Sequence, residues 1–281
     1  MIKSILTKAP IWNSKSLVER KLFGPKVTVL LFHHFESKYE LNRFRNTIER
    51  LASFADFICP ERFKSFQRGE YQITRDSFLV TFDDGFQSAY WATKEVLNPL
   101  GIKSIHFIAP AFLTSCVNDD DQLNFIRSNL KLQDVSKNNL APFRPMDQQQ
   151  IQNLHSTGHV FGSHTNSHPR LSDLSNNEIT NELIEAGRWI ESNIGYWPEF
   201  FAPPFGDLDA ISHCAIKIGL QKHQFLFTGL RGHIRSDNTR IVPRQSLNPK
   251  TSSYQQMNTS QGALDLPYRS SRRKLDRLQF Q

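Results

Sequence analysis

The stretch SFLVTFDDG, residues 77–85, joins six residues that suit a buried β-strand to two aspartates and a glycine. Residues 27–32, VTVLLF, form a second run of the same apolar, β-branched kind. Strands that are apolar on both faces are typical of parallel sheets, because helices cover both sides of such sheets. The two runs therefore predict strands within a parallel α/β fold.

Strand and helix patterns alternate on both sides of these runs. Helices are expected at 41–54, 87–98, 148–157, 175–195 and 209–219, and further strands at 105–109, 159–163, 223–227 and 240–244. Residues 114–146 interrupt the alternation, since they are polar with few periodic features, and we expect an insertion or long loop there. The strand–helix unit recurs about seven times, which predicts a closed or nearly closed barrel at this chain length.

Composition divides the 281 residues into three parts. Residues 1–26, a lead-in segment, hold six Lys or Arg and one Glu, which gives +5. Residues 250–281, a tail poor in apolar residues that is expected to be disordered, hold six Lys or Arg and two Asp, which gives +4. Since the whole chain carries +7, the main domain at 27–249 sums to 7 − 9 = −2.

This distribution of charge bears on partners. A basic chain alone would suggest a nucleic-acid partner, but the positive charge lies at the two ends and the domain between them is near neutral, so no nucleic-acid partner is expected. We expect solvated ends, with contact to an anionic membrane surface or an acidic glycan as the alternative.

Targeting signals and cysteines bear on location. No apolar run approaches the ~20 residues of a transmembrane helix, and the first residues lack the apolar stretch of a secretory signal. The three cysteines are far apart and odd in number, which argues against a disulfide framework. We therefore expect a cytoplasmic protein.

Three clusters follow predicted strands, at the carboxyl ends where parallel folds build their sites. They are TFDDG at 81–85, SHTNSHP at 163–169 and FAPPFG at 201–206. Two histidines four residues apart and a carboxylate are a common set of catalytic metal ligands, although such histidines alone are more often plain turn residues. Asp-Asp-Gly alone is usually a turn, yet adjacent carboxylates after an apolar strand repel one another and a divalent cation would offset this.

These clusters resemble the motifs of the polysaccharide deacetylases, the carbohydrate esterase family 4 with its NodB-like homology domain. TFDDG and SHTNSHP occur in the family's order over roughly residues 27–247, and Phe32-His33 is similar to the family's Tyr-His. The resemblance implies a distorted (β/α)7-type barrel with parallel strands and a catalytic domain at 27–249.

By position, the resemblance also implies roles for individual residues. Asp83 would be the general base, and Asp84, His164 and His168 would bind a divalent metal ion, with zinc expected. Pro203, Pro204 and Phe205 would form one wall of a substrate groove, and His33 would lie near its floor, although a simply packed histidine is an equal alternative there.

The chain departs from the family pattern at two points. Ala202 stands where many members have an arginine that orients the catalytic aspartate, and the late Leu-x-His that supplies a general acid is missing. RIVPR at 240–244 instead resembles the branch linked to exopolysaccharide and surface-glycan deacetylation, so Arg244 could orient Asp83, with a structural salt bridge as the alternative. Arg240 and Arg244 are expected to face the same way along one strand. His213, His223 and His233 are candidates for the acid.

The predicted function is metal-dependent removal of N-acetyl groups from amino sugars of a poly- or oligosaccharide, in surface or exopolysaccharide biosynthesis. One alternative is hydrolysis of other non-peptide C–N bonds, in small cyclic amides or ureides, on the same scaffold. The other is a non-catalytic glycan-binding barrel. The metal-ligand set argues against pure binding, because binding needs no activated water.

Overall fold

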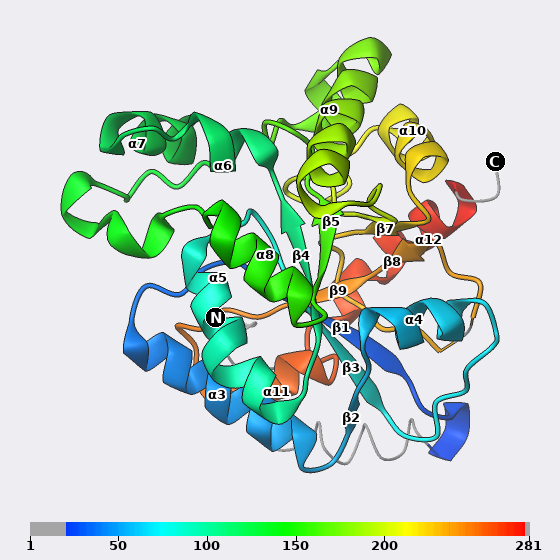
Figure 1. The fold of residues 1–281 in the computed structure, drawn as a ribbon. Coiled ribbons are helices and arrows are strands. Elements are labelled where there is room, and N and C mark those ends of the chain that lie inside the picture. The colour runs from blue at the N-terminus through cyan, green and yellow to red at the C-terminus, as the bar shows by residue number, and fades with distance from the viewer. Residues whose placement is uncertain (1–20, 236, 279–281) are drawn as a thin grey trace.

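A nearly closed barrel of parallel strands forms the centre of the molecule (Figure 1). The structure, a computed structural model, describes residues 21–235 and 237–278. The strands are β1 (Val27–Phe32), β2 (Asp56–Phe57), β3 (Ser77–Phe82), β4 (Ser104–Ile108), β5 (Val160–Ser163), β6 (Phe200–Phe201), β7 (Phe225–Phe227), β8 (Ile241–Val242) and β9 (Arg244–Ser246). Their order around the barrel is β8-β7-β6-β5-β4-β3-β1-β9, with β2 beside β3. The predicted distorted parallel barrel is confirmed.

Helices surround this barrel. They are α3 (Lys38–Ala52), α4 (Pro60–Gln67), α5 (Gln87–Ala92), α6 (Pro110–Ser115), α7 (Asp119–Ser128), α8 (Gln148–Ser156), α9 (Asn176–Ile194), α10 (His213–Lys222), α11 (Ser253–Ser260) and α12 (Arg269–Leu278). Capping boxes begin α8 at Asp147 and α9 at Ser175. None of the described helices combines the length and the apolar character that crossing a bilayer requires.

The two central strands show why both runs are largely apolar, without the alternation of a half-exposed strand. β1 and β3 pair in parallel along their whole length. Phe32 and Phe82 face outward, and their ring centroids lie 4.8 and 6.0 Å from that of Phe44 on α3. Val29 and Leu79 instead pack inside the barrel. Each fully buried side chain of this size stabilises the fold by roughly 1.5–3 kcal/mol.

The barrel closes through an interruption that the sequence pattern did not predict. Residues 240–244 were expected to form one strand, but β8 pairs with β7 and β9 pairs with β1, at opposite ends of the strand order. Only Pro243 separates them, and its missing N–H cannot continue a ladder. The expectation that Arg240 and Arg244 face the same way is wrong, since Arg240 is exposed and Arg244 is buried.

The long-loop prediction for residues 114–146 is also wrong. Asn118 caps α7, whose first turn holds three aspartates that interact favourably with the helix dipole. Leu123 and Ile126 then pack against Phe112 and Phe143 in a separate apolar cluster. Because the first turn of α7 is polar, the helical spacing of the apolar residues that follow it was not recognised in the sequence.

Residues 250–278 are folded, which corrects the expectation of disorder for this part of the tail; residues 279–281 lie outside the described residues. Met257 of α11 is buried in the cluster that contains Phe44 of α3, and Leu275 of α12 is buried against the α9–α10 side. Most other buried positions of α11 are small or polar, so no apolar pattern marked the segment. The predicted lead-in segment lies largely outside the described residues, because 1–20 are not among them.

Deleting residues 255–281 is therefore expected to lower stability and soluble yield instead of leaving the protein intact. Within the tail, Leu275→Ala should cost about 2–5 kcal/mol of unfolding free energy, because it removes a buried side chain. Its neighbour Lys274 is exposed, so Lys274→Ala should stay within about 0.5 kcal/mol. Denaturant unfolding measures both; equal stability of the deletion variant and the full chain would contradict this account.

Candidate functional site

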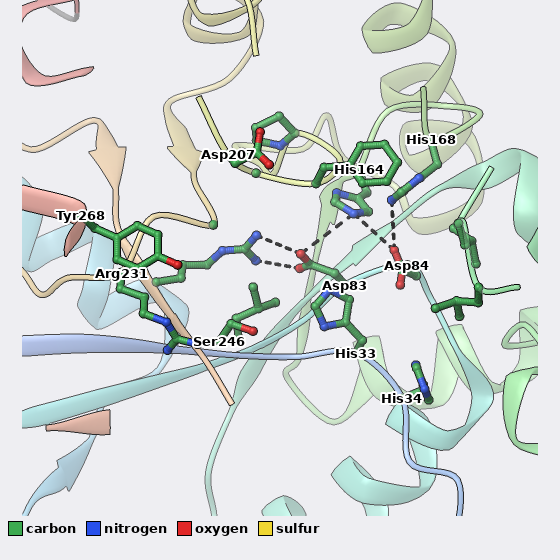
Figure 2. Close-up of a pocket in the computed structure, with 18 residues that line it drawn as sticks. His33, His34, Asp83, Asp84, His164, His168, Asp207, Arg231, Ser246 and Tyr268 are labelled. Carbon is green, nitrogen blue, oxygen red and sulfur yellow. Dashed lines mark hydrogen bonds and ion pairs between the residues drawn. The ribbon is translucent and has the colours of Figure 1, made fainter. Parts of the chain in front are cut away.

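Three loops meet at the carboxyl end of the barrel and carry the predicted clusters (Figure 2). They follow β3, β5 and β6, which are close neighbours in the sheet. Four of their residues hold a positive φ without being glycine, namely Asp84 (75°), Thr165 (63°), His168 (61°) and Phe205 (63°). Such backbone costs of order 1–3 kcal/mol per residue and persists at functional sites where the surroundings enforce it.

Specific contacts hold two of these loops in their backbone conformation. Glu182 of α9 accepts hydrogen bonds from the backbone N–H groups of Asn166 and Ser167, at 2.9 and 2.8 Å. Gly206 ends the third loop so close to Gly229 that a Cβ at position 206 would lie 2.4 Å from the Gly229 nitrogen. Only glycine fits there, which holds Phe205 at the mouth of the site.

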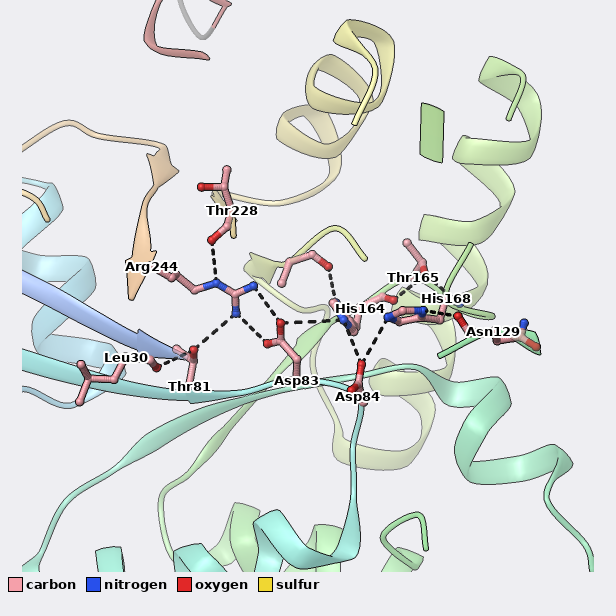
Figure 3. A network of polar contacts seen from close by, with 11 residues as sticks. Leu30, Thr81, Asp83, Asp84, Asn129, His164, Thr165, His168, Thr228 and Arg244 are labelled. Atoms are coloured by element: carbon pink, nitrogen blue, oxygen red, sulfur yellow. Dashed lines mark hydrogen bonds and ion pairs between the residues drawn. The ribbon is translucent and has the colours of Figure 1, made fainter. Parts of the chain in front are cut away.

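Asp84, His164 and His168 form a compact set of possible metal ligands (Figure 3). Asp84 Oδ1 lies 3.4 Å from His164 Nε2 and 3.3 Å from His168 Nε2. All three residues are buried, and one candidate ligand atom from each lies within 4.8 Å of the others. Burial raises the pKa of Asp84, but the two histidines lower it well below its usual range, so the carboxylate is ionised.

The outer nitrogens of both histidines are occupied by backbone carbonyls. His164 Nδ1 lies 2.6 Å from Ala202 O, and His168 Nδ1 lies 3.0 Å from Asn129 O. A proton on each Nδ1 leaves the lone pair of each Nε2 free to bind a metal ion beside Asp84, which is the arrangement of histidines that bind metals. The set therefore fits a divalent ion held by two nitrogens and one oxygen, as in catalytic zinc sites.

Asp83 makes a separate contact with Arg244. The guanidinium donates from Nη1 to Oδ1 at 2.7 Å and from Nη2 to Oδ2 at 2.8 Å, which is a bidentate pair (Figure 3). Arg244 Nε donates to Thr228 O at 2.9 Å, and the guanidinium carbon lies 5.3 Å from the Phe107 ring centroid. Burial raises the pKa of Asp83, yet Arg244, followed by His164, lowers it below its ordinary value.

A pocket of about 420 Å³ opens over these residues, within the range of small-ligand sites. It is lined by Leu31, His33, His34, Asp83, Asp84, Leu130, Leu132, His164, His168, Pro203, Phe205, Gly206, Asp207, Gly229, Arg231, Arg244, Ser246 and Tyr268. Of the predicted site residues, Pro204 alone is not among them, and it is buried. The other eight come together as the sequence analysis expected.

Several residues that line the pocket were not predicted from the sequence. Arg231 and Tyr268 carry no motif, and Tyr268 belongs to the tail that was expected to be disordered. Leu130 and Leu132 come from the supposed long loop. The packing of α7 and of the tail brings the two leucines and Tyr268 to the barrel mouth, so no pattern in a single sequence marks them. Arg231 lies in the connection between β7 and β8, where no motif marks it either.

The three candidate acids lie elsewhere. His213 is exposed at the start of α10, and His223 Nδ1 lies 2.7 Å from Pro198 O. His233 Nδ1 lies 3.2 Å from Asp265 Oδ2 and borders a different pocket. None of the three lines the pocket with the metal ligands.

Comparisons with known proteins point to one family. Its profile, described as polysaccharide deacetylase, matches residues 71–222. A peptidoglycan-N-acetylglucosamine deacetylase of Bacillus cereus is 34% identical over 58 residues, which cover 21% of each chain. Chitin deacetylase 1 of Cryptococcus neoformans is 38% identical over 71 residues, which cover 25% of this chain and 15% of that protein. The matched stretches span 21% and 15% of the length of these two relatives.

Solved structures share the fold. The structure of IcaB from Ammonifex degensii superposes with a TM-score of 0.66 at 19% identity, covering 85% of this chain and 97% of that one. The Streptococcus pyogenes deacetylase PplD, solved in complex with acetate, superposes with a TM-score of 0.64 at 16% identity, covering 84% and 98%.

Proposed function

The chain belongs to the polysaccharide deacetylase family, and we propose that it is a metal-dependent hydrolase that removes N-acetyl groups from amino sugars of a glycan. One observation carries this proposal. Asp83 stands beside the Asp84–His164–His168 set, yet it is paired with Arg244, so one carboxylate is free to act as a base while the other binds the ion. The chitin and peptidoglycan deacetylases among the relatives support N-acetylated sugars as the substrate class.

Asp84, His164 and His168 would hold the ion, for which zinc is the expected identity. When bound there, a divalent ion supplies Lewis acidity, polarising the acetamide carbonyl and making water a nucleophile at neutral pH. Asp83 would take the proton of the attacking water, and Arg244 would hold its carboxylate in place and ionised.

The leaving amine needs a proton, and we assign His33 as its donor. Besides the two ligands, His33 and His34 are the histidines that line the described pocket. His34 is turned toward the rim, where its Nε2 lies 3.4 Å from Glu36 Oε1, and burial lowers its pKa. Figure 2 draws His33 directly beside Asp83, on the side opposite His164.

The shape of the site favours a glycan over a small cyclic amide or ureide. Phe205 is 38% exposed at the mouth, and a second hollow of about 540 Å³ shares His33, His34, Leu132 and Ser246 with the first. Together they form an extended groove, which suits several sugar residues. The RIVPR pattern that supplies Arg244 supports a role in exopolysaccharide or surface-glycan biosynthesis.

Acetate release tests the proposal. The zinc-loaded protein should release acetate from at least one of a panel of N-acetylated oligosaccharides, and far less from cyclic amides and ureides at equal concentration. Turnover of a cyclic amide alone would support the other hydrolase, and binding of glycans without acetate release would support the non-catalytic barrel.

Arg244→Ala is expected to lower turnover by roughly 10²-fold, the cost of misplacing a catalytic group by about 1 Å. Because Arg244 lowers the pKa of Asp83, its loss raises that pKa, so the acidic limb of the pH–rate profile should move to higher pH. Loss of one partner of this buried pair should also cost about 3–5 kcal/mol of stability. The pH–rate profile and denaturant unfolding measure the two effects.

Two variants control this experiment. Arg244→Lys keeps the charge without the bidentate geometry and should restore the pH limb more than the turnover. Arg240→Ala removes an exposed arginine that donates to backbone carbonyls near α10 and should change turnover little. An unchanged acidic limb in a folded Arg244→Ala protein would refute the orienting role.

A further inference from the structure

Arg231 and Tyr268 occupy one end of the pocket. Figure 2 shows them on one side of Asp83, with Asp84 and His168 on the other. Neither residue contributes to the proposed chemistry, and both reach the pocket from segments outside the family motifs. The proposed deacetylation therefore does not account for the arginine at this end of the pocket.

The Arg231 guanidinium is only partly paired. Nη1 donates to Gln245 Oε1 at 3.2 Å, and the side chain also hydrogen-bonds Tyr268. Neither partner is a carboxylate, while arginine has five N–H donors. Within residues 21–235 and 237–278, no carboxylate forms an ion pair with Arg231.

The nearby carboxylate, Asp265, is engaged elsewhere. It accepts from His233 Nδ1 at 3.2 Å and from Gln245 Nε2. Burial lowers the pKa of Arg231, which reflects a partly desolvated cation; Tyr268 and Asp265 offset this only in part. A desolvated guanidinium that opens into a pocket binds an anion more strongly than an exposed one does.

We propose that Arg231, held by Tyr268 and Gln245, forms a subsite for an anionic substituent on the glycan next to the N-acetyl sugar. This inference rests on the proposed deacetylase function and narrows its substrate class to acidic glycans. The substituent is either a uronate carboxylate or a sugar phosphate. Both are oxyanions that can accept two hydrogen bonds from the N–H groups of one guanidinium.

Three substrates separate the cases. A tetrasaccharide of alternating N-acetylglucosamine and glucuronic acid carries carboxylates, diacetylchitobiose 1-phosphate carries a phosphate, and N-acetylated chitotetraose is neutral. The wild-type protein should show at least about a tenfold higher kcat/KM on one anionic substrate than on chitotetraose. The substrate that is preferred identifies the carboxylate or the phosphate as the ligand.

Arg231→Gln should lower kcat/KM on that anionic substrate about 10–100-fold, the effect of losing hydrogen bonds to a charged group, with less than about threefold change on chitotetraose. Arg231→Lys should keep part of the preference. Arg75→Gln removes the same charge at the opposite end of β3, where Arg75 pairs with Asp56 at 3.2 Å, and should change neither substrate. Unfolding temperatures of all variants verify that they are folded.

Two results would overturn the inference: a wild-type protein without preference for either anionic substrate, or equal losses of Arg231→Gln on anionic and neutral substrates. If no glycan releases acetate at all, the proposed function fails. The anion subsite is then tested separately, by measuring whether the protein binds the anions alone. NMR titration with glucuronic acid and with inorganic phosphate should then show binding that Arg231→Gln abolishes, and equal binding by both proteins would reject the subsite.

Discussion

Asp83→Asn is expected to lower acetate release by about 10²–10⁴-fold, the usual contribution of a general base, while the protein keeps most of its metal. The amide has the shape of the carboxylate but takes no proton, and Asp83 is not in the set of ligand atoms around Asp84. Its charge pair with Arg244 is lost as well, so some loss of stability accompanies the loss of rate. Turnover and elemental analysis on the same preparation measure both properties.

Asp84→Asn is the matched comparison, since it changes the neighbouring carboxylate in the same way. This variant should lose metal, because Asp84 is the carboxylate that lies 3.3–3.4 Å from the two histidine Nε2 atoms. Metal loss in Asp83→Asn with retention in Asp84→Asn would reverse the roles that we assign to the two residues.

The second large effect concerns the histidines. His164→Ala and His168→Ala are each expected to abolish most metal binding and to reduce acetate release to background, since each removes one of three protein ligands. The wild-type protein purified without chelator should hold about one ion per chain. Elemental analysis of the purified variants gives the metal content directly.

His213→Ala serves as the control, because His213 is exposed at the start of α10 and does not line the pocket. It should keep the metal content and the rate of the wild-type protein. Full metal content in both His164→Ala and His168→Ala would show that the ion is bound elsewhere.

Much of the barrel was predictable from local pattern. β1 and β3 are buried on both faces, so their sequences are largely apolar and their ends are clear. The junction at Pro243 was not predictable, because two short strands at opposite ends of the strand order read as one segment when their pairing is unknown. The tail was missed because small and polar residues fill much of its interface with α3.

The site likewise contains residues that the sequence predicted and residues that it did not. The proposed base and metal ligands follow β3 and β5, so their clustering followed from the parallel topology; Arg244 instead begins β9. Of the residues that shape the groove, Tyr268 and Leu132 reach it through the packing of the tail and of α7, whereas Arg231 reaches it from the connection between β7 and β8. The carbonyl of Asn129, which fixes the orientation of His168, depends on the end of α7 and leaves no trace in side-chain chemistry.

The most direct test of the central claim follows acetate and free amine in one reaction on an N-acetylated oligosaccharide. The account predicts equal amounts of both products, loss of both after chelation, their return with added zinc, and loss of both in metal-loaded Asp83→Asn. Acetate release that survives complete metal removal, or that is unchanged in Asp83→Asn, would contradict it.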